Sequence, residues 1–208
     1  MSRARVYPDE PVGPFPSPPR TITDAEGRSV RIRAVGPAEG ALDPDRALDP
    51  IVEMYAGFDP ADRAQGLPPT GDERIREWVA DLLDADAHNV VALVGSAVVG
   101  HAVLVPDEDV HELAIFVHHE YQEAGIGTAL LRTLLGHAAD LGIERVWLTV
   151  ERWNAPAINL YEKVGFETSS AEGFELEMAI RLRAEGDADA DGHPDPEADD
   201  ANADDGER

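Results

Sequence analysis

Two short segments of the chain combine residue types that suit the binding of an anion and the transfer of a proton. The first is a strand-to-helix connection with two glycines, made of Gln122, Glu123, Ala124, Gly125, Ile126, Gly127 and Thr128. Backbone N–H groups at the beginning of a helix lack intrahelical acceptors, and the helix dipole adds positive potential there. Glycine also lets phosphate oxygens approach the backbone closely. This segment therefore predicts an anion site suited to a pyrophosphate.

The same segment does not match two common nucleotide-binding motifs. It is not a P-loop, because no Gly-Lys-Ser/Thr follows the glycines. It also lacks the third glycine of the dinucleotide fingerprint and the acidic residue that follows the next strand in that motif. Two glycines before a helix are otherwise common, so the identity of the anion depends on other parts of the chain.

The second segment lies about thirty residues further on and contains Asn154, then Tyr161 seven residues later, then Gly165-Phe166. A phenol with a pKa of about 10 keeps its proton at neutral pH and can donate it to a developing anion. Two structural alternatives stay open. Tyr161 also continues an apolar helical stripe and would look the same as a core tyrosine. Asn154 would suit the beginning of a helix before Pro156.

The segments around these residues alternate between strand and helix patterns. Apolar alternation predicts strands over Ser29–Ala34, Asn89–Val94, Ala97–Val105, Val110–His118, Ile143–Val150 and Phe174–Leu182. Apolar residues at helical spacing predict helices over Asp49–Phe58, Glu73–Leu83, Gly127–Leu141 and Ala155–Val164. Gly95-Ser96 suits a type II′ hairpin turn. The pattern predicts a mixed α/β sheet with crossover helices.

The order Gln122-x-x-Gly125-x-Gly127, a strand, Asn154, Tyr161 and Gly165-Phe166 resembles the GNAT superfamily of N-acetyltransferases. The resemblance covers about residues 28–182. It implies an α/β (α+β) fold with a mixed, mostly antiparallel central sheet of six to seven strands. It further implies that the fourth and fifth strands of that sheet splay apart to admit acetyl-CoA as cosubstrate.

The resemblance also assigns roles to particular residues. The backbone of Phe116 and Val117 would hydrogen-bond the pantetheine arm like an extra strand, and the loop amides from Gln122 to Thr128 would hold the pyrophosphate. Asn154 would contact the pantetheine arm near the thioester. Tyr161 would protonate the departing thiolate, a role that its phenol suits chemically.

The general base is less determined than the acid. A thioester is attacked by a neutral amine, so a carboxylate or a water chain must accept the proton of the amine. Glu112 stands where many members of the superfamily have a glutamate, although it could equally be a solvated charge at a strand end. His111 and Glu151 are the other candidates. No metal site is expected, because the histidines lack partners at ligand spacing.

Composition bounds the remaining possibilities. The net charge is −25, from 42 acidic and 17 basic residues, so nucleic-acid binding is not expected. Acidity spread along the whole chain suggests a halophilic archaeon, because strong salt screens such charges. No cysteine is present, which excludes disulfides and cysteine nucleophiles. We expect a proline-rich, mostly disordered arm over 1–27, an N-acetyltransferase domain over 28–182 and an acidic disordered tail over 183–208.

The acceptor amine is open at this point: a protein lysine, a protein N-terminus or a small molecule. Phe58–Pro69 is expected to form a loop on the acceptor side. There are two alternatives to an enzyme. One is a catalytically silent CoA-binding regulatory module, and the other is an acidic scaffold that uses its tails to bind basic partners. A cytoplasmic location without membrane attachment and a possible homodimer complete the expectations.

Overall fold

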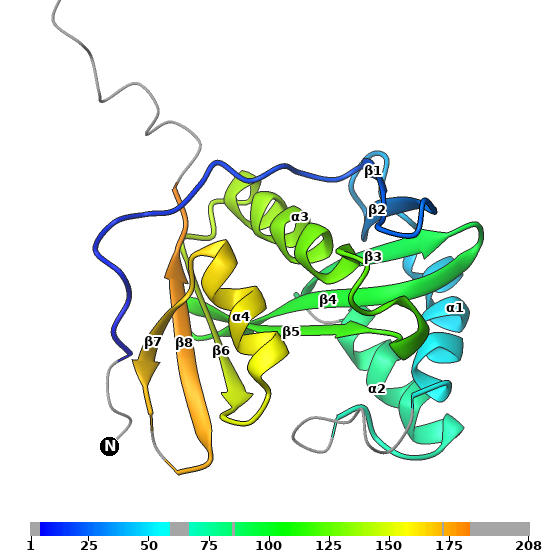
Figure 1. The fold of residues 1–208 in the computed structure, drawn as a ribbon. Helices are drawn as coiled ribbons and strands as arrows, with labels where there is room; N and C mark the ends of the chain where they lie inside the picture. Colours follow the sequence, from blue (N-terminus) through cyan, green and yellow to red (C-terminus); the bar gives the residue numbers. More distant parts are fainter. Residues whose placement is uncertain (1–4, 59–66, 85, 172, 184–208) are drawn as a thin grey trace, which may run out of the picture.

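The computed structural model describes residues 5–58, 67–84, 86–171 and 173–183 (Figure 1). One mixed sheet holds eight strands in the order β1-β2-β3-β4-β5-β6-β8-β7. The strands are β1 Arg20–Thr23, β2 Ser29–Val35, β3 His88–Val94, β4 Ala97–Asp107, β5 Val110–Val117, β6 Arg145–Glu151, β7 Glu167–Ser170 and β8 Glu175–Arg181. The helices are α1 Pro44–Ala56, α2 Asp72–Asp84, α3 Ile126–Asp140 and α4 Ala155–Val164, with a 3₁₀ turn η2 at His119–Tyr121.

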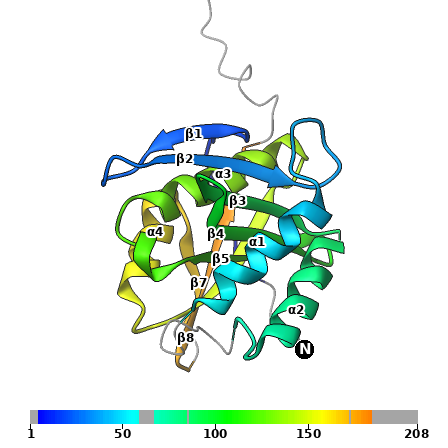
Figure 2. The same cartoon turned by 90° about the vertical axis from the view of Figure 1, so that its right-hand side faces the viewer.

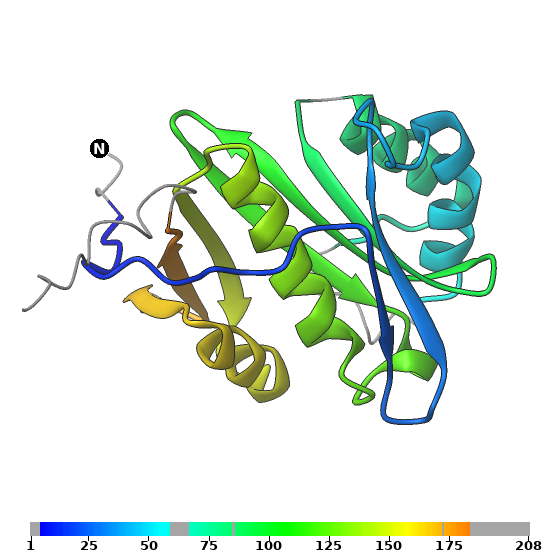
Figure 3. The ribbon, with the colours of Figure 1, turned by 90° about the horizontal axis from the view of Figure 1, so that it is seen from above.

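The helices cover the two faces of the sheet in pairs. Helices α1 and α2 lie side by side on one face of the sheet (Figure 2), and α3 and α4 lie on the other, as the view from above shows (Figure 3). The leucines of α3 pack on the inner strands in the larger apolar core, and α1 and α2 bury a second core with Tyr55 at its centre. No helix in the described part of the chain is long and apolar enough to cross a membrane.

Strands β5 and β6 splay apart, as predicted. They are the parallel pair of the sheet and share only the pairs His111↔Val146 and Glu112↔Trp147. Beyond Glu112 the edge of β5 no longer faces a strand among the described residues, although β4 still pairs with its other edge as far as Val117. Buried backbone N–H and C=O groups require hydrogen-bond partners. The opening between the two strands therefore suits a ligand with polar groups along its length.

The predicted mixed, mostly antiparallel sheet is confirmed, with eight strands rather than six to seven. Sequence patterns miss β1 and β7, which are four residues long and largely polar, too short for apolar alternation to show. Helix α1 begins at Pro44 rather than Asp49, because Asp43 caps it by accepting a hydrogen bond from the Arg46 amide. The hairpin turn agrees with the prediction, since Gly95 has a φ of +61°.

The N-terminal segment differs from the disordered arm expected over 1–27. Its described residues pack along the molecule and cross α3 (Figure 3). The Val12 amide donates to the Arg181 carbonyl at 2.8 Å, and the Arg183 amide donates to the Val12 carbonyl at 3.0 Å. Pro16 lies so close to α3 that a Cβ on Gly136 would be 2.4 Å from its carbonyl oxygen. Backbone pairing and a glycine on the helix thus order a segment that lacks apolar periodicity. The tail beyond Arg183 lies outside the described residues.

Candidate active site

The loop between β5 and α3 presents unpaired amides at the beginning of the helix. Glu123 and Gly125 have left-handed φ values of +59° and +85°. Gly125 is the N-cap of α3 and supplies no side-chain cap. The first backbone hydrogen bond of the helix runs from the Ala129 amide to the Gly125 carbonyl at 3.2 Å. The amides of residues 126–128 therefore precede the intrahelical ladder and are available to an anion.

Glycine suits positions 125 and 127 of this loop for different reasons. At Gly125 the left-handed backbone itself favours glycine. At Gly127 the backbone is helical, and an added Cβ would meet only Leu160 and Val117, each at 3.7 Å, which is ordinary contact distance. The described part of the chain thus gives no steric reason for glycine at 127. The predicted pyrophosphate would supply one, because its oxygens need close approach to the backbone of this turn.

Neighbouring contacts hold the loop in place. Ala124 and Ile126 are buried in the larger core, and the Ala124 carbonyl accepts a hydrogen bond from the Ala25 amide at 3.0 Å. The side chain of Gln122 donates from Nε2 to the Val117 carbonyl at 2.9 Å. The sequence predicted only a backbone role for Gln122. The structure adds a side-chain bond that ties the loop to the end of β5.

Phe116 and Val117 lie on the part of β5 that faces the opening. The Phe116 side chain points toward α1, where its ring packs edge-on against Tyr55 with centroids 5.3 Å apart. Val117 packs on the opposite core, beneath α3. Both backbones lie beyond the last pair shared with β6, so their position agrees with the pantetheine role, which stays a prediction. Of the expected acceptor-side loop, residues 59–66 lie outside the described residues.

Asn154 caps α4, which confirms the structural alternative for this residue. Its Oδ1 accepts a hydrogen bond from the Ala157 amide at 3.2 Å. A cap of this kind fixes the entry of the chain into the helix. Since the oxygen is engaged, the amide nitrogen is the part of Asn154 that remains to donate to a ligand carbonyl. Capping and cofactor contact are therefore compatible, and the contact stays a prediction.

Tyr161 lies on the buried side of α4 with 8% of its surface exposed. Burial raises the pKa of its phenol to about 12, so the group keeps its proton throughout the neutral range. Its ring packs against Phe166 with centroids 5.7 Å apart. Tyr161 is therefore both a core residue, as the structural alternative has it, and a protonated phenol that could act as an acid.

Glu112 is half-buried on the face of β5 that carries Phe116, because residues two apart on a strand share a face. Burial raises the pKa of its carboxyl, Asp107 raises it further, and the guanidinium of Arg5 opposes both. A carboxylate with a raised pKa is a stronger base and accepts a proton from an ammonium group more readily. Glu112 also forms the last pair with β6, opposite Trp147, and so stands where the two strands part.

The other two base candidates lie in different places. His111 faces the α3 side, where its ring lies 5.7 Å from that of His88, and burial lowers its pKa. Glu151 ends β6 and shares the face of Glu112, because Trp147 and Glu151 are four residues apart on one strand. Glu112 and Glu151 therefore lie on one face of the sheet and His111 on the other, with about 13 Å of β6 between Trp147, the partner of Glu112, and Glu151. Within the described ranges no group of three His, Cys, Asp or Glu residues could hold a metal ion.

Sequence reasoning missed a further cluster beside Glu112. Arg5 forms ion pairs with Asp107 and Glu177, and its guanidinium lies over the ring of Trp147. The two ion pairs span 102 and 172 residues of sequence, so no local motif could show them. Only the order and register of the strands bring these residues to one face.

Comparison with known proteins agrees with this geometry. The family model described as the acetyltransferase (GNAT) family matches residues 50–166. An uncharacterized N-acetyltransferase of Mycobacterium tuberculosis is 36% identical over 81 residues, which cover 38% of this chain and 52% of that protein. The chain thus spans about half the length of the curated relatives it matches first.

Solved structures show the same fold. The GNAT domain of S. lividans PAT superposes with a TM-score of 0.66 at 16% identity, covering 78% of this chain and 96% of that one. The PaiA N-acetyltransferase from Thermoplasma acidophilum, solved in complex with coenzyme A, gives a TM-score of 0.54 at 19% identity. It covers 74% of this chain and 99% of that one. Since the family model spans more than half of the sequence, the chain belongs to the acetyltransferase (GNAT) family.

Proposed function

We propose that this protein transfers the acetyl group of acetyl-CoA to a primary amine by direct attack of the amine on the thioester. The observation that carries the proposal is the opening between β5 and β6. It begins immediately after the Glu112–Trp147 pair and leads to the open amides of the loop before α3. An extended cosubstrate in which a pantetheine arm links a pyrophosphate to a thioester fits this combination. Membership of the family supports it.

In this proposal different residues bind different parts of acetyl-CoA. Amides of the loop Gln122–Thr128 hold the pyrophosphate, and the open edge of β5 at Phe116 and Val117 pairs with the pantetheine arm. Asn154 donates from its amide nitrogen to that arm. The thioester supplies an activated acyl carbon, and these contacts fix its orientation and exclude water.

Proton transfers complete the reaction. Glu112, directly or through water, takes the proton of the incoming ammonium, so that the neutral amine can form the new C–N bond. As the C–S bond breaks, Tyr161 donates its phenolic proton to the sulfur. After attack the nitrogen carries one further proton, and its loss returns a proton to the phenolate of Tyr161. Coenzyme A leaves as the thiol, and the proton first taken by Glu112 passes to solvent, so charge and protons balance. Glu151 is the alternative base, because it shares the face of Glu112.

The test is release of free thiol from acetyl-CoA against a panel of amines and lysine peptides, in molar KCl. We expect release that depends on a particular amine and falls at least about tenfold in Tyr161→Phe, the lower end of general-acid contributions. Tyr121→Phe is the matched control, since Tyr121 lies on η2 beneath the guanidinium of Arg28 and should retain activity. Acetyl-CoA binding without any acceptor-dependent release would favour the regulatory module. Failure to bind acetyl-CoA would refute the proposal.

Several finer features are proposals on the same basis. The acceptor is the amine of a protein lysine, a protein N-terminus or a small molecule. The net charge of −25 favours a halophilic archaeal source and disfavours nucleic acid as a partner. A cytoplasmic location, a homodimer and a catalytic domain over 28–182 complete the proposal. Unfolding measured in low and molar KCl tests the halophilic origin, which predicts a more stable protein in high salt.

A further inference from the structure

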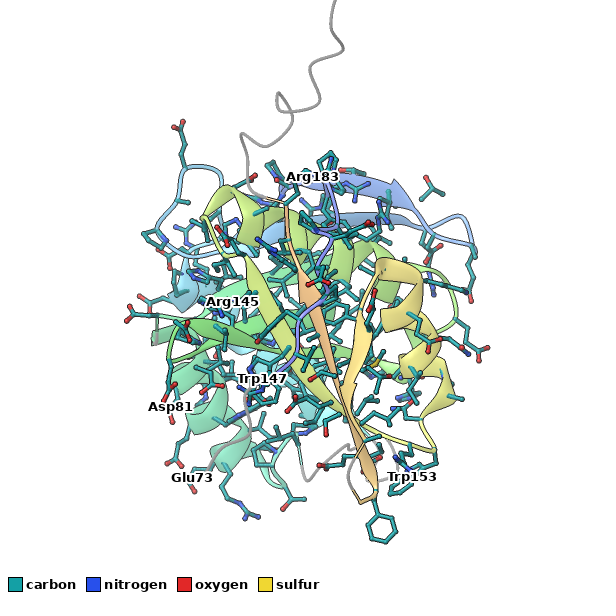
Figure 4. All side chains as sticks on the ribbon, turned by 90° about the vertical axis from the view of Figure 1, so that its left-hand side faces the viewer. Glu73, Asp81, Arg145, Trp147, Trp153 and Arg183 are labelled. Atoms are coloured by element: carbon teal, nitrogen blue, oxygen red, sulfur yellow. The ribbon has the colours of Figure 1, made fainter. Side chains whose placement is uncertain are left out.

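The N-terminal segment places an arginine against the sheet beside the candidate base. Nη1 of Arg5 lies 2.9 Å from Oδ2 of Asp107, and Nε lies 3.3 Å from Oε2 of Glu177. Its guanidinium carbon stands 3.4 Å from the centroid of the Trp147 ring. Figure 4 shows Trp147 beside the N-terminal segment where this segment runs along the sheet. Two carboxylates and an aromatic face thus surround one cation.

This cluster shares a face with Glu112 at the point where the strands part. Trp147 pairs with Glu112 across β5 and β6. Asp107 pairs with Val110, two residues before Glu112, and Glu177 pairs with Thr149, two residues after Trp147. Directly paired residues point to the same side of a sheet. The cation of Arg5 therefore stands within one or two strand positions of the predicted reaction centre.

The surroundings of Arg5 have the chemistry of a binding site for a cation. Trp147 is 8% exposed, and the face of its ring is the part that contacts the guanidinium of Arg5. The second carboxylate oxygen of Glu177 accepts a hydrogen bond from Ser169 at 2.8 Å, which orients the carboxylate. Carboxylates bind a guanidinium or ammonium group by charge-assisted hydrogen bonds, and an indole face adds a cation–π contact.

The N-terminal segment has other anchors besides Arg5. Tyr7 packs on Trp147 and Val110, and Val12 bonds to the end of β8. The side chain of Arg5 is 25% exposed and that of Asp107 is 39% exposed, so solvent reaches this ion pair and screens it in part. Release of Arg5 from the cluster would therefore leave the anchors at Tyr7 and Val12 in place.

We propose that Asp107, Trp147 and Glu177 form a subsite for a second cationic group of the acceptor, which Arg5 occupies when no acceptor is bound. The proposal rests on the proposed function and narrows its substrate class to amines that carry a further guanidinium or ammonium group.

The test measures binding of N-acetyl-arginine amide, which has a guanidinium but no free amine, by calorimetry. Its neutral isostere is N-acetyl-citrulline amide. If Arg5 fills the subsite about nine-tenths of the time, Arg5→Ala should bind the guanidinium probe about tenfold more tightly than the wild type. Adding Glu177→Gln to Arg5→Ala should remove that gain. The citrulline probe should bind all of these proteins equally weakly.

The control is Arg31→Ala, which removes the same charge from an exposed position on β2, where Arg31 donates to the Gly95 carbonyl at 2.5 Å. An equal gain in Arg31→Ala, an equal gain for the citrulline probe, or no gain in Arg5→Ala would overturn the subsite. Acetyl-CoA affinity is measured on the same samples. If acetyl-CoA does not bind, the proposed function fails, whereas the guanidinium titration still decides whether the subsite exists.

Discussion

Acidification from pH 7 to pH 5 should destabilise the fold through one fully buried histidine, His101 on β4. Its Nδ1 lies 2.8 Å from the Tyr55 hydroxyl, and its Nε2 lies 2.9 Å from Oδ1 of Asn89. The Asn89 amide nitrogen donates to the carbonyls of Leu82 and Ala87, so its Oδ1 must be the acceptor for His101. His101 is therefore protonated on Nε2, and Nδ1 accepts from the phenol.

The magnitude follows from the pKa of this imidazole. Burial lowers the pKa of His101 from 6.5 to about 4, because the charged ring loses its hydration inside the protein. The folded state therefore favours the neutral ring, and the contribution of His101 to stability is complete above pH 6.5 and lost as the pH falls toward 4. At about 1.4 kcal/mol per pH unit, the free energy of unfolding should fall by about 2 kcal/mol between pH 7 and pH 5.

The assay is denaturant unfolding at both pH values and constant salt, for the wild type and for His101→Gln. Glutamine cannot titrate, so the wild type should lose about 2 kcal/mol more than the variant on acidification. The pKa values of the half-buried His88, His111 and His137 are lowered as well, but they titrate in both proteins and cancel in the difference. Equal losses in the two proteins, or a His101 pKa near 6.5 by NMR, would refute this account.

Three substitutions give further expectations. Gly136→Ala should destabilise the protein by about 1–3 kcal/mol in denaturant unfolding, despite the helix preference for alanine, because the new Cβ would strike the Pro16 carbonyl. Gly127→Ala should leave the midpoint of unfolding unchanged or raise it, and weaken acetyl-CoA binding in calorimetry. Asn154→Ala should cost about 1 kcal/mol of stability through loss of the Ala157 cap. It should also raise the KM for acetyl-CoA, whereas a cap alone would leave the KM unchanged.

The sequence predicts the long elements of the fold well, because their apolar faces repeat at the helix or strand period. Helix α4 occupies Ala155–Val164 as predicted, since Asn154 caps one end and Gly165 closes the other with a φ of +111°. The sequence does not predict β1 and β7, because a strand of four residues has at most two residues on a buried face. The sequence does not predict that the N-terminal segment is ordered, for another reason. Its partners are backbone groups near Arg181 and a glycine on α3, and neither gives the segment an apolar pattern.

In the candidate site, too, the sequence shows the parts that are close together along the chain and misses those that only the fold brings together. The loop around Gly125, the cap at Asn154 and the phenol of Tyr161 lie within one continuous stretch, so their spacing is visible in the sequence. Arg5 and Trp147 meet only because the N-terminal segment passes over β6, more than a hundred residues away along the chain. The choice among the base candidates likewise needs the sheet. A strand pattern alone turns His111 and Glu112 to opposite faces, but only the structure shows which face lies toward α3 and which toward α1.

Helix α3 carries two glycines, Gly127 and Gly136, whose surroundings differ. Glycine inside a helix costs about 1 kcal/mol relative to alanine, so each of the two needs a compensating cause. At Gly136 the cause is within the chain, because the Pro16 carbonyl occupies the space of a Cβ. At Gly127 an alanine would fit against Leu160 and Val117 at ordinary distances. The described residues therefore supply no steric cause at Gly127, and the pyrophosphate proposed to bind the open amides of this turn would supply one by its close approach to the backbone.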